Sequence, residues 1–425
     1  SGSMWVNLGD KYSQRVATRS SSHQDGLFPD RPELKKDWKR DRELGLARMP
    51  ADNLITTAAG DVRPIREKSL MGLPWRYAIG CIDNLDLILR AEVIWCLSGG
   101  ARVYAEIDGK PRPVMLRDLV RAYKPENVRL WNGEKWTQVL GWNKSNDTDG
   151  ALEFELRSGE RIGCTPGHRW PTNRGLLRAD DVRVGDVFDG CRLPGHALPR
   201  HHISNDAAWF VGLYLAEGSM SGKTIQIAGH VKETDRLERL KKLAADYDGS
   251  CNVYTDGNKA TIALSGSVLR GILDRYLSPG TAKTKRLRRH AWAMPDSFLI
   301  HLMQGYLSGD GHYDEANSRW RLGFTENDEW AADLRTLAAR LDASLTLKRT
   351  TVDGFGKKWP AWRGEWRWSG TVRYPRNEVV AIRASRARQF FDVGVADEPH
   401  LFALASGVLT HNSKPNGLPE SVTDR

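Results

Sequence analysis

Residues 96 to about 195 alternate short runs of hydrophobic and β-branched residues with two-residue turn signals. Short runs of this kind, separated by turns that pair Asp, Asn or Ser with Gly, are typical of hairpins in an all-β unit. The predicted strands are Arg102–Ile107, Val128–Trp131, Thr137–Trp142 and Leu152–Leu156, and the predicted turns are Asp108-Gly109, Asn132-Gly133 and Ser158-Gly159.

The pattern changes between residues 204 and 370 and returns to β character over 378–412. Two apolar runs of helical length, Trp209–Gly218 and Phe298–Gly311, each end in an acidic residue followed by Gly. Mixed helix and strand patterns follow each run. A domain is tolerated inside another when the insertion point is a surface loop whose ends lie close together. We therefore expect an all-β domain that is split by an α+β insert.

The segment before residue 96 has a different character. Residues 11–50 are polar and charged and predict a long loop. A helix is expected to about Asn84 and a strand over Leu87–Trp95. Ser1–Ser3, before Met4, has the composition of a cloning scar. A chain of 425 residues is too long for one ordinary domain, so two to four are expected.

Charge and cysteine content narrow the class of protein. The net charge of +10 and the pI of about 9.3 favour a polyanionic partner. The five cysteines are widely spaced and form no CxxC pair, which disfavours a zinc site or a secreted disulfide framework. No apolar run approaches the ~20 residues of a membrane span. We expect a cytoplasmic, monomeric protein without membrane contact.

Reactive side chains stand at the borders of the split β unit. Cys96 follows the run that ends at Trp95, the Thr165–His168 segment reads as a tight turn, and the His411–Ser413 motif lies near the end of the chain. Cysteine is the most nucleophilic side chain near neutral pH, so its thiol would attack the preceding carbonyl and form a thioester. A histidine is the usual proton carrier for such a step.

The downstream motif completes a reaction. Ser413 Oγ would attack the thioester and accept the upstream chain, and Asn412 would cyclise through its own amide with help from His411. Thr165 would either donate to the scissile carbonyl or orient His168. Proximity on one chain would supply most of the rate, because effective molarities reach the order of 10⁵–10⁸ M for well-oriented groups.

In this order the motifs resemble those of an intein with the Hint (horseshoe-like) fold. The resemblance implies autocatalytic splicing of residues 96–412 and ligation of Trp95 to Ser413, with no cofactor. It also implies that Asp392 and His400 line the site, with Asp392 tuning the thiol of Cys96. The matching stretches are Cys96–Gly99, Gly163–His168, Phe391–Val395, His400–Ala403 and His411–Ser413.

Each motif taken alone has an ordinary structural explanation. Cys96 would be a small buried hydrophobe, His168 a satisfied turn histidine, and Asp392 a strand-end cap. The order and joint occurrence favour splicing. A hedgehog-like autoprocessing protein would use an external nucleophile, which the presence of Asn412 and Ser413 disfavours. A further alternative is a chain that acts primarily as a DNA endonuclease, with slow or impaired splicing.

The two apolar helices of the insert carry the second candidate chemistry. Small residues let two helices approach closely, and the glycine after each acid is expected to end the helix. Packed side by side, the helices would bring Glu217 and Asp310 together as the ligands of a Mg²⁺ ion for phosphodiester hydrolysis. The pair of helices resembles that of the LAGLIDADG homing endonucleases. The alternative is that both are ordinary core helices with capped acids and no catalytic role.

Basic and aromatic residues of the insert favour double-stranded DNA as the partner. The alternative is a solvated charged face with core tryptophans. Either Lys283 or Lys285 would stabilise the transition state. The DNA-binding candidates are Lys283, Lys285, Arg286, Arg288, Arg289, Lys357, Lys358, Arg363 and Arg367.

The flanks contain the stretches Trp5–Asp10 and Leu73–Arg76, and splicing would join Ala91–Trp95 to Ser413–Arg425. These stretches resemble a site-specific DNA methyltransferase of the adenine-N6 or cytosine-N4 type, an α/β enzyme that uses S-adenosylmethionine. Its catalytic and cofactor motifs are absent here, so the fragments are expected not to methylate and to serve as native flanking sequence. The resemblance implies a bacterial or phage source and, as DNA target, the methyltransferase gene without the insert. The expected parts are 1–3 (scar), 4–95 (N-extein), 96–199 and 377–412 (splicing domain), 200–376 (endonuclease) and 413–425 (C-extein).

Overall fold

The computed structural model describes residues 54–56, 62–64, 96–145, 150–195, 203–354, 356–368 and 375–412. The chain divides into two compact units, one of Ser1–Glu92 with Pro415–Arg425 and one of Val93–Lys414. In the first unit, β1 (Leu54–Thr56) and β2 (Val62–Pro64) pair antiparallel. The described residues exclude the expected scar, Trp95 and Ser413. They also exclude the two expected methyltransferase fragments, apart from β1 and β2. Among the described helices, none is long and apolar enough to cross a membrane.

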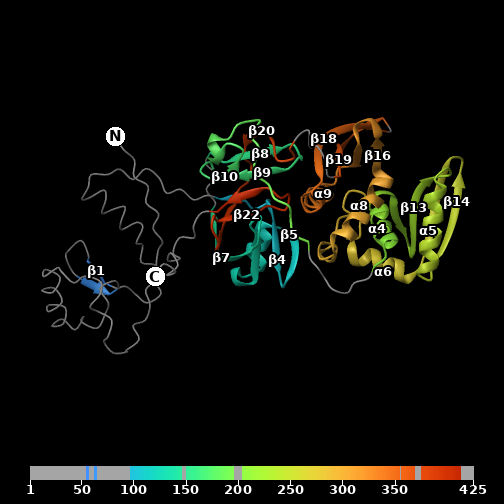
Figure 1. Cartoon of the computed structure of the whole chain (residues 1–425), viewed down its shortest axis with the longest axis horizontal. Coiled ribbons are helices and arrows are strands. Elements are labelled where there is room, and N and C mark those ends of the chain that lie inside the picture. The colour runs from blue at the N-terminus through green and yellow to red at the C-terminus, as the bar shows by residue number, and fades with distance from the viewer. Residues whose placement is uncertain are drawn as a thin grey trace, which may run out of the picture. The chain divides into compact units, whose positions relative to one another are not determined.

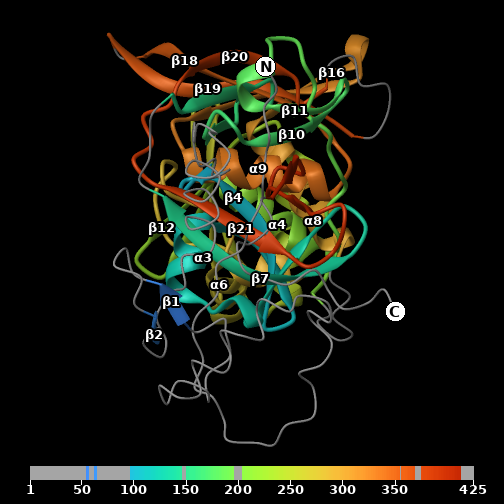
Figure 2. The ribbon, with the colours of Figure 1, turned by 90° about the vertical axis from the view of Figure 1, so that its left-hand side faces the viewer.

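Strands from both sides of the insert form one nine-stranded sheet in the second unit, in the order β20-β8-β9-β3-β21-β7-β6-β4-β5. The late strand β21 (Phe390–Val395) pairs with the early strands β3 (Leu97–Ser98) and β7 (Trp136–Ser145). Figures 1 and 2 show the late strands, in red, among the early ones, in teal. The sheet therefore joins chain segments on either side of the insert, as the sequence pattern predicts.

The four strands with predicted ranges, β4, β6, β7 and β8, follow those ranges closely, because their apolar positions face one hydrophobic core. Two short hairpins, β10–β11 and β22–β23, lie beside the large sheet. Their bounds and those of the other sheet strands are β4 (Arg102–Ile107), β5 (Lys110–Met115), β6 (Val128–Trp131), β8 (Leu152–Leu156), β9 (Arg161–Cys164), β10 (Arg169–Thr172), β11 (Gly175–Arg178), β20 (Val379–Ala384), β22 (Leu401–Ala403) and β23 (Leu409–His411).

This β part also contains a short helix that the sequence reasoning missed, α3 (Leu116–Ala122). Its buried residues are Leu116 and Leu119, three positions apart and therefore on one helix face. A seven-residue helix gives too short a periodic signal to be separated from a strand by pattern alone. The prediction of an entirely β unit is corrected by this element.

The insert contains the same arrangement twice. A long helix leads directly into a four-stranded antiparallel sheet, and the strand orders β12-β13-β15-β14 and β16-β17-β19-β18 correspond position by position. The helices are α4 (Asn205–Glu217), α5 (Thr234–Asp246), α6 (Ser267–Tyr276), α7 (Arg289–Trp292), α8 (Asp296–Asp310) and α9 (Asp328–Arg340). The strands are β12 (Gly218–Ser221), β13 (Thr224–His230), β14 (Ser250–Asp256), β15 (Lys259–Ser265), β16 (Gly311–Asp314), β17 (Arg319–Thr325), β18 (Ser344–Gly354) and β19 (Lys357–Arg367).

Helices α4 and α8 lie side by side at the centre of the insert, in backbone contact (Figure 1). A Cβ atom on Gly212 would overlap the Leu302 carbonyl, and one on Gly305 would overlap the Trp209 carbonyl. Only glycine, which has no side chain, permits backbones to come this close. The two glycines therefore set the distance between the helices and hence between the acids at their ends.

Replacing Gly212 or Gly305 by Ala is expected to destabilise the chain, because the obstructing atoms are backbone atoms that cannot rotate away. Overpacking of this kind costs about 1–3 kcal/mol. The matched control is Gly271→Ala in α6, where a Cβ would meet nothing within 4 Å. That variant is expected to gain about 0.5–1 kcal/mol. Thermal unfolding of the three variants measures both effects, and an unchanged melting temperature for Gly212→Ala would contradict the close contact.

Candidate active sites

Cys96 lies buried directly before β3, opposite Thr165. Its backbone N–H donates to Thr165 Oγ1 at 3.0 Å, and its carbonyl accepts from the Thr165 N–H at 3.0 Å. The threonine hydroxyl therefore holds the nitrogen of the bond between residues 95 and 96. The sequence reasoning placed this hydroxyl at the scissile carbonyl or at the histidine, and the structure adds the Cys96 N–H as a partner. The scissile carbonyl belongs to Trp95, outside the described residues.

The same turn connects Thr165 to the end of the described chain. The His168 N–H donates to the Thr165 carbonyl at 3.1 Å, and His168 Nε2 lies 2.6 Å from Thr410 Oγ1. Thr410 belongs to β23, two residues before Asn412. A continuous series of hydrogen bonds thus joins Cys96, through Thr165 and His168, to the strand that leads to Asn412. Thr410 is a residue that sequence reasoning missed, because no local pattern marks a threonine as the partner of a distant histidine.

The other predicted residues surround this series. Asp392 is buried on β21, one position beyond the pair Phe391–Leu97, so the antiparallel register places it next to Cys96. The carbonyl of His400 accepts the Asn412 N–H at 3.0 Å, and Asn412 is 1% exposed. His400 therefore contacts Asn412 through its backbone.

His411 precedes Asn412 at the end of β23. Burial lowers the pKa of the His411 imidazole below its usual value, although a hydrogen bond with the Asn412 backbone opposes the shift. A lowered pKa keeps the ring neutral at pH 7, and a neutral ring can accept a proton. His411 is thus in the protonation state that a general base requires.

In the insert, α4 ends at Glu217 and α8 ends at Asp310, and the structure brings these ends together. A Cβ on Gly309 would lie 3.0 Å from Glu217 Cγ. The glycines that follow the acids have extended backbones, with φ of −86° at Gly218 and −99° at Gly311. Both glycines cap the C-termini of their helices, as predicted, in an extended rather than a left-handed conformation. Space also requires glycine here, because a Cβ on either would collide with the preceding helical turn.

The two acids are held in an environment that disfavours their charge. Burial, and then the neighbouring Glu217, raise the pKa of Asp310 to about 6, while Tyr306 and Lys285 oppose the shift. Burial also raises the pKa of Glu217, which the nearby Arg236 opposes. Because burial is the first cause of both shifts, each carboxylate lies where its charge is poorly solvated, and a bound cation would favour the charged form.

Lys285 is the cation next to this pair. Its ammonium donates to the carbonyls of Tyr214 at 2.8 Å and Gly218 at 2.9 Å. Burial lowers the pKa of Lys285 to about 8, and the charges of Asp310 and Glu217 oppose that shift. Lys283 lies elsewhere, with its ammonium 5.7 Å from the centre of the Trp359 ring. The structure thus separates two lysines that the sequence left equivalent.

The donor set fits a hard divalent cation. Carboxylate oxygens are the ligands that Mg²⁺ prefers, and it usually takes one or two of them together with water and substrate phosphate. Within the described ranges, no cluster of three or more His, Cys, Asp or Glu side chains could hold a metal ion. Glu217 and Asp310 are the two acids at the ends of α4 and α8.

The remaining basic candidates have mixed surroundings. Arg286 pairs with Glu329, Arg288 donates to the Asp274 carbonyl, and Arg367 donates to the Asn317 carbonyl at 2.9 Å. Lys357 and Lys358 are exposed at the start of β19, and Arg363 lies in the same strand. Arg286, Arg288 and Arg289 also line a cavity of about 470 Å³ together with Arg102 and Arg112.

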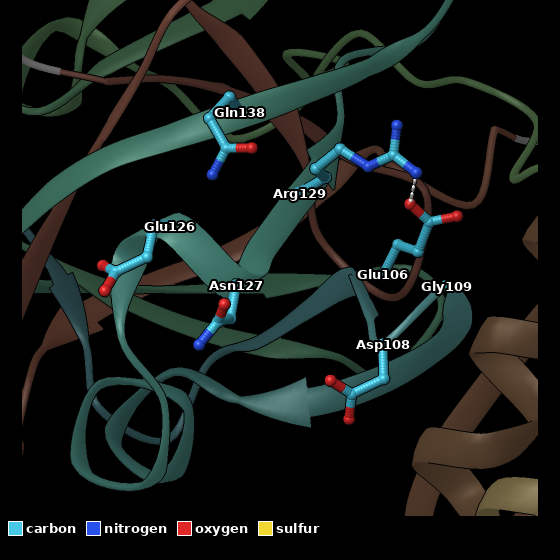
Figure 3. Close-up of a pocket in the computed structure, with 7 residues that line it drawn as sticks. All are labelled: Glu106, Asp108, Gly109, Glu126, Asn127, Arg129 and Gln138. Carbon is cyan, nitrogen blue, oxygen red and sulfur yellow. Dashed lines mark ion pairs between the residues drawn. The ribbon is translucent and has the colours of Figure 1, made fainter.

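A second hollow, of about 220 Å³, lies at the edge of β4, β6 and β7 (Figure 3). Figure 3 shows the ion pair between Glu106 and Arg129 in its wall. Gln138, also in the wall, donates to the carbonyls of Pro125 and Val128 at 3.0 Å. None of the predicted catalytic residues lines this hollow, so it is separate from both candidate sites.

No family model matches the chain. It is 25% identical over 322 residues to an iron-sulfur cluster assembly SufBD family protein of Mycobacterium tuberculosis, covering 72% of this chain and 34% of that protein. It is 20% identical over 308 residues to a subunit of the A-type ATP synthase of Pyrococcus abyssi, covering 60% and 29%. The DNA-directed RNA polymerase subunit Rpo1C of Methanocaldococcus jannaschii matches at 20% identity over 260 residues, covering 52% and 30%. The chain spans about a third of the length of these relatives.

Solved structures with similarity to the chain include two proteins of LAGLIDADG type. I-DmoI in complex with DNA and Ca has a TM-score of 0.27 at 10% identity, covering 38% of this chain and 82% of that chain. The N-terminal LAGLIDADG domain of DUF199/WhiA has a TM-score of 0.26 at 12% identity, covering 40% and 80%. Both matches span less than half of this chain.

Proposed function

We propose that the insert is a metal-dependent DNA endonuclease. The observation that carries this proposal is the close, buried pair Glu217–Asp310 with Lys285 beside it. Two carboxylates whose charge is only partly neutralised suit a divalent cation such as Mg²⁺ and a polyanionic substrate. The net charge of +10 favours association of the chain with DNA.

Each residue of the pair has a defined task in this proposal. Glu217 and Asp310 hold the cation at the junction of the helices, and Gly212 and Gly305 fix the separation of their ends. A bound Mg²⁺ supplies polarisation of the phosphodiester and a more acidic water. Lys285, anchored to the carbonyls at the end of α4, contributes positive charge next to the reacting phosphate.

Cleavage is expected to depend on pH through Asp310. Its pKa of about 6 is raised, so the carboxylate becomes protonated as the pH falls through 6 and then cannot hold the cation. Below that pH the rate is expected to fall about tenfold per pH unit, and more Mg²⁺ should shift the profile to lower pH because cation and proton compete. The substrate is a plasmid that encodes residues 4–95 joined directly to 413–425. A rate that stays constant from pH 5 to pH 8 would count against this role of Asp310.

We also propose that the segment Cys96–Asn412 excises itself from the chain. The hydrogen-bonded series Cys96–Thr165–His168–Thr410 supports this second activity, because it brings the upstream junction to the strand of the downstream junction. Cys96 Sγ attacks the carbonyl of residue 95 as that C–N bond breaks, and the released amine takes the proton. Thr165 holds this nitrogen, and His168, in the same turn, acts as the proton carrier.

The later steps use the downstream motif. Ser413 Oγ displaces the Cys96 thiol and forms an ester with the upstream chain. The Asn412 side-chain nitrogen then attacks the main-chain carbonyl carbon of Asn412. A succinimide forms, the peptide bond to Ser413 breaks, and the Ser413 amine is freed. That amine attacks the ester, so an amide joins residues 95 and 413 and the hydroxyl is regenerated. Neutral His411 accepts the proton from the Asn412 amide.

The curated relatives also favour self-excision. Their names describe three unrelated roles, in iron-sulfur cluster assembly, ATP synthesis and RNA synthesis, and each matches over about a third of its length. A segment that removes itself can reside in unrelated hosts, because the joined host is left intact. Intact-mass measurement of the purified chain over time, with and without reductant, tests the proposal. Only the full-length mass at all times would overturn it.

A further inference from the structure

Helix α9 of the insert holds a turn of the β part. The guanidinium of Arg335 donates to two successive carbonyls, those of Ser158 and Gly159, both at 2.9 Å. Burial lowers the pKa of Arg335 to about 10, and the nearby Glu160 and Asp328 oppose the shift. A rigid fork of donors on two backbone acceptors fixes both the position and the direction of a turn.

This turn leads directly to the splicing residues. Ser158 and Gly159 connect β8 to β9, and β9 runs without interruption into Thr165. Gly159 has φ of +72°, and a Cβ there would lie 2.7 Å from the Leu347 carbonyl oxygen and 2.9 Å from the Trp362 ring. Leu347 and Trp362 belong to β18 and β19 of the insert. The hairpin that presents Thr165 is therefore seated on the insert from its turn end.

Helix α9 also contacts the turn between β22 and β23, which leads to the downstream junction. Ala339 is buried beside Tyr104 and Leu193, and its carbonyl accepts the Leu193 N–H at 3.1 Å. A Cβ on Gly407 would lie 2.8 Å from Ala339 Cβ. Gly407 lies in the turn between β22 and β23, and β23 continues to Asn412. One helix of the insert thus contacts the turn that precedes Thr165 and the turn that precedes Asn412.

We propose that α9 is a positioning element of the splicing site: Arg335 places the Thr165–His168 turn against Cys96, and Ala339 seats the β22–β23 turn that delivers Asn412. The inference rests on the proposed self-excision. It assigns the insert a second role besides DNA cleavage, since the insert completes the scaffold of the site that removes it. Small displacements of a reacting group have large effects, because a shift of about 1 Å costs on the order of a hundredfold in rate.

The test measures the two ends separately in the full chain. Thiol-induced release of residues 1–95 reports the upstream step, and release of residues 413–425 in a Cys96→Ala background reports Asn412 cyclisation. Arg335→Met is expected to slow the upstream step roughly ten- to hundredfold and the downstream step much less. Arg335→Lys keeps the positive charge and one donor nitrogen but loses the planar fork of the guanidinium, so it should recover part of the rate. Ala339→Val overpacks against Gly407, so it should slow the downstream step more than the upstream step.

The matched control is Arg349→Met. Arg349 lies over the same Trp362 ring, at 5.2 Å against 5.3 Å for Arg335, but it pairs with Asp328 and makes no hydrogen bond to the β8–β9 turn. It is expected to leave both steps unchanged. Equal slowing of both steps by Arg335→Met, in parallel with its melting temperature, would show a structural role only and overturn the proposal. If Arg335→Met fails to fold, the upstream and downstream rates are compared in Arg335→Lys and Ala339→Val instead. Absence of both releases in the wild type would instead overturn self-excision, and the role of α9 with it.

Discussion

Replacing Asp310 by Asn is expected to reduce metal-dependent DNA cleavage by at least about a hundredfold while leaving DNA binding intact. Asn has nearly the shape of Asp, so the contact between α4 and α8 is preserved. It carries no charge, so the cation loses one of its two acidic ligands. The basic residues proposed to contact DNA lie on other elements, and binding should therefore persist. Glu217→Gln is expected to behave in the same way.

The same substitution has a second expected effect, of opposite sign, on stability. Burial and the neighbouring Glu217 raise the pKa of Asp310 to about 6, above its value in an unfolded chain. Ionised Asp310 therefore destabilises the folded state at pH 8, and this cost grows as the pH rises through 6. Asp310→Asn removes that cost, so its melting temperature at pH 8 should equal or exceed that of the wild type.

Cleavage and gel-shift assays on the plasmid substrate, together with thermal unfolding at pH 8, measure these effects. The control is Asp246→Asn, because Asp246 is an exposed acid at the end of α5 and is not among the groups that shift the pKa of Glu217 or Asp310. It is expected to change neither cleavage nor stability. Cleavage by Asp310→Asn at the wild-type rate would exclude this carboxylate from the site.

The helix pair shows what sequence reasoning reaches in this chain. Apolar runs that end in an acid and a glycine predict both helices and the meeting of Glu217 with Asp310. The steric reason for Gly218 and Gly311 was not accessible, because it depends on how Tyr214 and Leu307 of the preceding turns face them. The sequence could not distinguish Lys283 from Lys285 either, because both lie in one polar loop. Only the path of that loop in the folded chain brings Lys285 to the end of α4.

The β part shows a similar division. Alternation and turn residues predict strands to within a few residues, because one face of each strand is buried. The contacts of Thr410 with His168, and of Arg335 with the β8–β9 turn, join residues 242 and about 177 positions apart. No local pattern encodes such contacts. The sequence therefore reached the residues with reactive groups but not those that place them.

Separate substitutions at the two junctions are expected to divide self-excision into its halves. Cys96→Ala removes the nucleophile, so no thioester forms and residues 1–95 stay attached under all conditions. Asn412 remains able to cyclise, so slow release of residues 413–425 is still expected. Asn412→Ala should give the opposite result, because the thioester forms at residue 96 and hydroxylamine cleaves the chain there.

Thr165→Ala provides an intermediate case. The Cys96 N–H then loses its hydrogen-bond acceptor, and the scissile nitrogen is no longer held, so upstream release should slow roughly tenfold without being abolished. The control is Cys164→Ala. Burial raises the pKa of the Cys164 thiol to about 12, which leaves it a neutral core residue one position before Thr165. This variant should retain the hydroxylamine-sensitive bond.

The pattern across the four variants decides between activities. A protein that is only an endonuclease has no reason to hold a reactive bond at residue 96, so its wild type and its Asn412→Ala variant would resist hydroxylamine equally. A self-excising segment requires sensitivity that Cys96→Ala abolishes, Thr165→Ala weakens and Cys164→Ala leaves intact. Because Cys96 and Cys164 are both buried thiols near the same turn, the contrast between them reports hydrogen bonding and position, not the mere presence of sulfur.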